Sequence, residues 1–128
     1  MARILVAEDE ETVRALVSRA LTDDGHEVVA AADGAEALEV LQREAGRFDL
    51  LLTDIKMPVM DGLALALAAA RDFQALPILL MTGYADQRER ASGLDALIHD
   101  VIAKPFTLAT IRTAVNGALG AGTAQAMI

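Results

Sequence analysis

The sequence predicts an α/β domain built on a five-stranded parallel sheet with helices on both faces. Five short apolar runs alternate with five segments of helical character. The runs are Arg3–Ala7, His26–Ala31, Asp49–Thr53, Pro77–Met81 and about Asp100–Ala103. Apart from the second, they are nearly continuous, which is typical of strands buried on both faces. Because crossovers between parallel strands are right-handed, this alternation predicts a doubly wound (βα)5 three-layer sandwich.

Four of the helices are predicted from apolar residues that recur every three or four positions. Their apolar faces are Val13, Leu16, Val17, Ala20 and Leu21; Ala37, Leu38, Leu41 and Ala45; Leu63, Ala66, Leu67 and Ala70; and Leu108, Ile111, Val115 and Leu119. Gly25 and Gly46 are expected helix stops, and Asp33 and Thr107 expected N-caps. The remaining helical segment, Asp86–Leu94, is charged with a thin apolar stripe, so we expect it to move readily.

Composition limits the classes of function. The 128 residues suffice for one domain, predicted to span 1–119, with 120–128 a flexible tail of small residues. A net charge of -8 argues against binding nucleic acid, whose phosphates are captured by Lys and Arg. The absence of cysteine excludes disulfides and thiolate chemistry. We find no signal peptide, and the longest apolar stretch is too short to span a membrane, so we expect a cytoplasmic protein.

Chemically active side chains follow four of the five predicted strands. Glu8 and Asp9 follow the first, Asp54 the third, Thr82 the fourth and Lys104 the fifth. In open parallel sheets the site lies outside the carboxyl ends of the strands, so we expect these groups to meet at one edge. Acids, a hydroxyl and an ammonium at one place suit phosphoryl transfer to a carboxylate beside a metal ion.

Four motifs carry a family resemblance. They are Ala7-Glu8-Asp9-Glu10, Thr53-Asp54-Ile55-Lys56-Met57-Pro58-Val59-Met60-Asp61-Gly62, Met81-Thr82-Gly83 and Lys104-Pro105-Phe106. In this order, each after a predicted strand, they resemble the receiver domain of two-component response regulators, the CheY-like family, over residues 3 to 119. The resemblance implies a flavodoxin-like fold with strand order 2-1-3-4-5.

The resemblance implies that Asp54 is the phosphoacceptor, forming an acyl phosphate. It also implies that Mg²⁺ is held by Asp9, Glu8, Asp54 and the backbone carbonyl of Lys56. The plainer alternatives are that Asp54 caps a turn and that the acids at 8 to 11 enrich a helix N-terminus with negative charge. We assign Glu10 and Glu11 only to this role of adding negative charge at the helix N-terminus.

Lys104 is expected, by the same resemblance, to pair with Asp54 and later with a phosphoryl oxygen, and its bond to Pro105 to be cis. Thr82 is expected to donate its hydroxyl to a phosphoryl oxygen, beside Gly83, where a small residue lets the backbone approach. Taken singly, Lys104 could be a surface lysine before a turn, and Thr82 an ordinary threonine at a strand end.

The chain departs from the family pattern at the switch position. Many receivers carry an aromatic residue three positions before the lysine, where this chain has Val101. Tyr84, two residues after Thr82, is the nearest aromatic residue. Lys56 and Tyr84 hold the positions that tune dephosphorylation in the family. We hypothesise that Tyr84 hinders the hydrolytic water, so that Tyr84→Ala shortens the phosphoryl half-life.

The favoured interpretation is a single-domain response regulator rather than an enzyme. A histidine kinase or phosphotransfer protein would supply the phosphoryl group, and the fourth helix, fifth strand and fifth helix would contact an effector protein. We expect a monomer or a phosphorylation-dependent dimer. The short chain and small-residue tail also resemble stand-alone bacterial regulators of cell-cycle proteolysis. One alternative is a pseudo-receiver that only binds partners. The other is an aspartyl-phosphate phosphatase, which would need an acidic residue at the position that Lys56 occupies.

Overall fold

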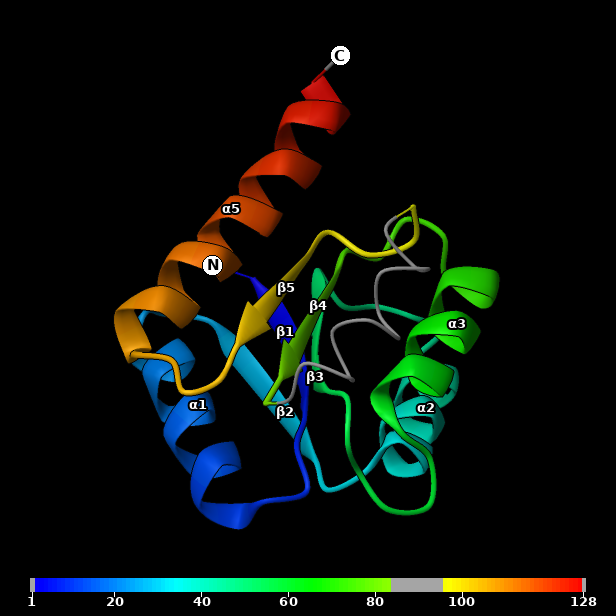
Figure 1. Cartoon of the computed structure of the whole chain (residues 1–128). Coiled ribbons are helices and arrows are strands. Elements are labelled where there is room, and N and C mark those ends of the chain that lie inside the picture. The colour runs from blue at the N-terminus through cyan, green and yellow to red at the C-terminus, as the bar shows by residue number, and fades with distance from the viewer. Residues whose placement is uncertain (1, 84–95, 128) are drawn as a thin grey trace.

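The structure is a computed structural model that describes residues 2–83 and 96–127. Strands and helices alternate along the described chain (Figure 1). The elements are β1 (Arg3–Ala7), α1 (Glu11–Asp23), β2 (Glu27–Ala31), α2 (Gly34–Arg43), β3 (Leu50–Asp54), α3 (Gly62–Asp72), β4 (Ile78–Thr82), β5 (Asp100–Ala103) and α5 (Leu108–Met127). The predicted helix Asp86–Leu94 and Tyr84 lie outside the described residues. None of the described helices is long and apolar enough to cross a membrane.

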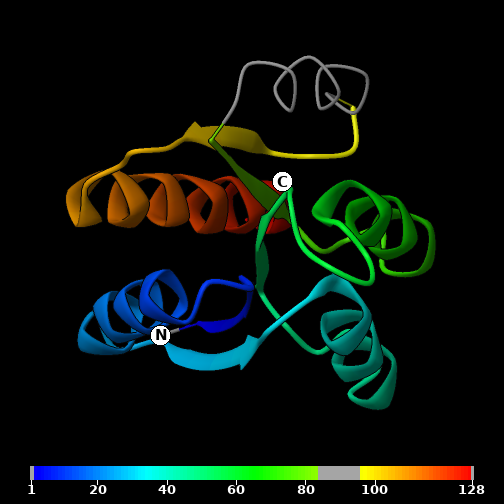
Figure 2. The same ribbon diagram turned by 60° about the horizontal axis from the view of Figure 1, so that its bottom comes forward.

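The five strands form one parallel sheet in the order β2-β1-β3-β4-β5, which confirms the predicted topology. Figure 2 shows α1 and α5 on one face of the sheet and α2 and α3 on the other. The chain leaves β1 toward one edge of the sheet and β3 toward the other. The strand order therefore reverses between β1 and β3, and their carboxyl ends form the crevice where such folds place a site.

Successive residues of each strand enter opposite halves of the core. Ile4 and Val6 pack with α1 and α5, whereas Leu5 and Ala7 pack with α2 and α3. All four side chains are fully buried. This two-sided burial explains the continuous apolar runs, and each buried Leu or Ile side chain contributes about 1.5–3 kcal/mol.

Side-chain caps fix the starts of three helices. The Asp33 Oδ1 atom accepts a hydrogen bond from the Glu36 amide at 2.8 Å, and the Thr107 Oγ1 atom accepts one from the Thr110 amide at 3.1 Å. Both caps were predicted. Asp61 caps α3 in the same way, by accepting a hydrogen bond from the Ala64 amide at 2.9 Å. Each cap satisfies an amide that the helix itself leaves unpaired.

Several boundaries differ from the prediction, and β2 begins at Glu27, one residue later than expected. β3 and β4 are each displaced by one residue, so that Asp54 and Thr82 are the last residues of strands. The predicted end of the domain at residue 119 is not the end of α5, which continues to Met127 and extends beyond the sheet in Figure 1. Residues 120–127 contain three alanines, the strongest helix former, against two glycines. The flexibility of this segment stays a prediction.

Candidate functional site

The five predicted side chains lie at the carboxyl edge of the sheet. Glu8 and Asp9 directly follow β1, Asp54 ends β3, Thr82 ends β4 and Lys104 directly follows β5. Parallel register brings these strand ends level, because Ala7 pairs with Thr53 and Thr82 pairs with Ala103. The convergence expected from the sequence is therefore present.

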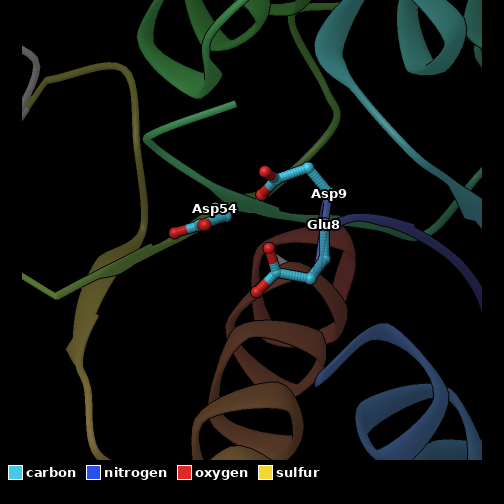
Figure 3. Close-up of side chains that lie close together, drawn as sticks. All are labelled: Glu8, Asp9 and Asp54. Carbon is cyan, nitrogen blue, oxygen red and sulfur yellow. The ribbon is translucent and has the colours of Figure 1, made fainter. Parts of the chain in front are cut away.

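Three acids face one small space. Ligand oxygens of Glu8, Asp9 and Asp54 all lie within 4.8 Å of one another. Figure 3 shows the Asp9 side chain turned toward Asp54, with Glu8 beside them. Glu8 is fully buried, Asp54 is 6% exposed and Asp9 is exposed. Magnesium–oxygen distances of about 2.1 Å place ligand oxygens about 3–4 Å apart, so these hard oxygen donors fit a magnesium ion after a small contraction or with bridging water.

Lys104 connects two of these acids. Its Nζ atom lies 2.8 Å from the Glu8 Oε1 atom and 3.2 Å from the Asp54 Oδ2 atom. The sequence predicted the contact with Asp54 but not the shorter one with Glu8. The extra methylene of glutamate allows a buried carboxylate at position 8 to reach the ammonium. Lys104 therefore neutralises part of the charge of the cluster.

Burial and neighbouring charges change the proton affinity of the site. Burial raises the pKa of the Glu8 carboxyl to about 7, the Asp54 charge adds to this rise, and the hydrogen bond from Lys104 opposes it. Burial acts to lower the pKa of the Lys104 ammonium, but its contacts with Glu8 and Asp54 outweigh this and leave that pKa raised. Lys104 is thus a cation at neutral pH, whereas Glu8 exchanges a proton near neutrality.

The Asp54 carboxylate is oriented by the backbone that follows it. The Ile55 amide donates to the Asp54 Oδ1 atom at 3.0 Å, which leaves Oδ2 on the side of Lys104. Gly62 packs directly on this turn: a Cβ atom there would lie 1.9 Å from the Asp54 carbonyl oxygen. The Gly62 amide also donates to the Ile55 carbonyl at 2.7 Å. Only glycine permits α3 to begin so close to the strand end.

The ends of β4 and β5 hold the remaining groups. Thr82 is 3% exposed, and its carbonyl accepts a hydrogen bond from the Lys104 amide at 2.7 Å. The Lys104–Pro105 peptide bond is cis, as predicted. A Cβ atom at Gly83 would lie 3.9 Å from the Lys104 Cδ atom, which is ordinary contact. The small residue therefore leaves room beside the lysine without being required by it.

Lys56 is exposed in the loop after β3, and Val101 is half-buried in β5. Tyr84 lies outside the described residues, so its effect on dephosphorylation stays a prediction.

Sequence reasoning missed three features. An open cavity of about 970 Å³ adjoins the acids and continues along α1 and the start of α5; its lining includes Val13, Leu16, Phe106 and Leu108. The Arg14 Nη1 atom donates to the Glu8 carbonyl at 3.0 Å. Val59 adopts a φ of 68° and is 85% exposed. Exposed Leu16 on an apolar stripe could have signalled the cavity, but no spacing pattern signals the other two.

A family model for the response regulator receiver domain matches residues 4–116. The chain belongs to this family. Among curated relatives, the response regulator MprA of Mycobacterium leprae is 38% identical over 117 residues, which are 91% of this chain and 50% of that protein. The transcriptional regulatory protein TcrA of Mycobacterium tuberculosis is 37% identical over 106 residues, 83% of this chain and 41% of the relative. The receiver chain thus spans half or less of the length of these relatives.

Solved structures agree with this assignment. A response regulator receiver domain protein of Clostridium thermocellum has a TM-score of 0.89 at 25% identity, covering 98% of this chain and 99% of that one. The response regulator TrrA of Thermotoga maritima, solved in complex with Mg(2+)-BeF, has a TM-score of 0.81 at 30% identity, covering 92% and 99%. The chemotaxis response regulator CheY4 of Vibrio cholerae also has a TM-score of 0.81, at 32% identity, covering 92% and 98%.

Proposed function

We propose that this receiver domain accepts a phosphoryl group on Asp54 in a two-component phosphorelay, with Mg²⁺ bound at Glu8, Asp9 and Asp54. One observation carries the proposal: a buried, oriented carboxylate lies against two further acids and the Lys104 ammonium. The donor would be a phosphohistidine of a histidine kinase or phosphotransfer protein. The TrrA structure solved with Mg(2+)-BeF supports the choice of cation.

In the proposed transfer, an oxygen of the Asp54 carboxylate attacks phosphorus. The phosphorus–nitrogen bond of the donor breaks, the imidazole nitrogen leaves with the electron pair, and an acyl phosphate forms. Lys104 and the Thr82 hydroxyl are the proposed partners of the new phosphoryl oxygens. When bound, Mg²⁺ supplies positive charge that offsets repulsion among the carboxylates and the incoming oxygens. The Lys56 carbonyl is a proposed further ligand.

The proposed output is a change in protein contacts. A phosphoryl group adds about -1.5 to -2 charge units and three acceptor oxygens at Asp54. Drawing Thr82 and Lys104 toward these oxygens displaces the ends of β4 and β5, and through them the face that includes Val101 and α5. Action as a single-domain regulator and phosphorylation-dependent dimerisation stay predictions. The name of the TcrA relative makes an attached transcriptional effector the alternative.

The test is phosphorylation by acetyl phosphate with Mg²⁺, followed by intact-protein mass spectrometry. The wild type should gain one phosphoryl group, and Asp54→Asn should gain none. Asp33→Asn is a matched control, since it removes an acid that caps α2 while keeping the capping oxygen. A wild type that stays unmodified would identify a pseudo-receiver.

We propose no enzymatic turnover beyond self-phosphorylation and slow autodephosphorylation. A phosphatase with an aspartyl-phosphate intermediate needs an acid two residues after its nucleophile, and Lys56 holds that position. Incubation with p-nitrophenyl phosphate should release no nitrophenol above the rate of Asp54→Asn. Steady release by the wild type alone would favour the phosphatase.

A further inference from the structure

Arg14 connects the first helix to the acids of the site. It lies partly buried in the first turn of α1, and its Nη1 atom donates to the Glu8 carbonyl at 3.0 Å. Its own amide donates to the Glu10 carbonyl at 2.9 Å. The guanidinium thus reaches back over the loop between β1 and α1. This loop contains Asp9.

The other polar groups of Glu8 are held by different elements. Its amide donates to the Ala31 carbonyl of β2 at 3.1 Å, and its carboxylate contacts Lys104 and, more weakly at 3.4 Å, the Glu10 amide. The carbonyl bonded by Arg14 belongs to the peptide unit that links Glu8 to Asp9. The tilt of that unit therefore depends on the Arg14 hydrogen bond.

Asp9 depends on this backbone for its direction. It is exposed, and within the described part of the chain its side chain has no hydrogen bond or ion pair. Even so, it turns toward Asp54, as Figure 3 shows. Because no side chain among the described residues bonds the Asp9 carboxylate, its direction follows from the peptide unit that precedes it.

We propose that Arg14 is a positioning residue for the cation site: its hydrogen bond to the Glu8 carbonyl sets the Glu8–Asp9 peptide and presents the Asp9 carboxylate to the cation. This inference rests on the proposed function, because it assigns Arg14 a role in magnesium binding at the same site.

Positioning and charge predict opposite effects. A guanidinium near three acids repels an incoming cation, so removing the charge alone should tighten magnesium binding. Removing the hydrogen bond frees the peptide unit and should weaken binding. If positioning dominates, Arg14→Met weakens magnesium binding about three- to tenfold, the range expected for one hydrogen bond. Methionine keeps most of the apolar stem, so that loss of packing is limited.

The experiment measures the magnesium dissociation constant by calorimetry for the wild type, Arg14→Met, Arg14→Lys and Arg19→Met. Arg19 is exposed on the same helix, farther from the acids, and controls for net charge and helix composition. Lysine at position 14 keeps the charge but has a different donor geometry. Its magnesium dissociation constant should therefore lie between those of the wild type and Arg14→Met. If Arg14→Met does not fold, the magnesium dissociation constants of Arg14→Lys and the wild type decide whether Arg14 positions the site.

Two further readouts separate positioning from general damage. At saturating magnesium, the rate of phosphorylation by acetyl phosphate should return to near the wild-type value, because only the presentation of a ligand is impaired. Without metal, the amide NMR shifts of Asp9 and Glu10 should change in Arg14→Met and not in Arg19→Met. Tighter binding in Arg14→Met, or equal constants in the two methionine variants, would overturn the proposal. A wild type that binds no magnesium would instead refute the proposed function.

Discussion

Glu8 is the most deeply buried of the three acids and makes the shorter of the two contacts with Lys104. Its carboxylate is fully buried, bonded to Lys104, and carries a pKa raised to about 7. A buried glutamic acid that is partly protonated at neutral pH must lose its proton before a cation can share its oxygens. Proton and cation therefore compete at this side chain.

This competition predicts that magnesium affinity depends on pH. Because the pKa is raised, Glu8 is mostly neutral below pH 7 and ionised above it. The magnesium association constant should thus rise by up to about tenfold per pH unit below 7 and level off above about pH 8. Calorimetry between pH 6 and 8.5 measures it. In Glu8→Gln the dependence should be lost, and an unchanged slope in that variant would assign the proton elsewhere.

Val59 holds a strained backbone at the molecular surface. A β-branched residue with a φ of 68° is unusual, and its 85% exposed side chain gains little from packing. Left-handed backbone costs an L-residue about 1–2 kcal/mol, and glycine avoids this cost. Glycine also loses more conformational entropy on folding, which cancels part of the stability gained by the substitution. Val59→Gly should therefore raise the free energy of unfolding by about 0.5–1 kcal/mol.

Urea denaturation measures this effect. The control is Ala15→Gly, which removes an exposed side chain inside α1 and should lower stability by about 1 kcal/mol. A loss of stability in both variants would mean that the Val59 side chain has a packing role.

At the scale of elements, the start of α3 determines how the end of β3 is held. A Cβ atom at position 62 would meet the Asp54 carbonyl oxygen at 1.9 Å, and a backbone atom cannot move aside as a side chain can. Gly62→Ala should lower the free energy of unfolding by about 1–3 kcal/mol and slow phosphorylation of Asp54. Gly117→Ala in α5, where a Cβ meets nothing within 4 Å, should instead stabilise by about 0.5–1 kcal/mol. Thermal unfolding and the acetyl phosphate assay measure both.

The ends of the strands could be predicted because the sequence changes there from buried apolar residues to charged or hydroxyl side chains. An apolar run that stops at Asp54 or Lys104 marks both the strand and the side chain at its carboxyl edge. The Glu8–Lys104 contact was not predictable, because it depends on the reach of one side chain across the site. The continuation of α5 past Leu119 was not apparent from the sequence, because Gly120 and Gly122 disfavour a helix where the intervening and following alanines favour one.

At the scale of the molecule, the end of the sheet opposite the acids carries an ion-pair network around Arg3. The Arg3 Nε atom lies 2.6 Å from the Glu27 Oε2 atom, and its other nitrogens bond the Glu44 carboxylate and, at 2.9 Å, the Arg47 carbonyl. The guanidinium also lies 4.5 Å from the ring centre of Phe48. One side chain thus connects β1, β2 and the segment after α2.

Arg3→Met should lower the midpoint of chemical denaturation, because several contacts that are individually weak are lost together. Phosphorylation of Asp54 should keep its rate, since the network lies at the far end of the strands. Arg71→Met, which breaks one pair between adjacent exposed residues, should leave the denaturation midpoint almost unchanged. Chemical denaturation and the phosphorylation assay together check both statements, and a slowed reaction in Arg3→Met would contradict this separation.

The hydrogen bond from the Lys104 amide to the Thr82 carbonyl joins the two residues expected to contact a phosphoryl group. When Thr82 moves toward a phosphoryl group, Lys104 should therefore move in the same direction, so that the two residues shift together. Intermediate states in which one residue has shifted and the other has not should be sparsely populated. Relaxation-dispersion NMR on the two amides should accordingly report a single shared exchange rate.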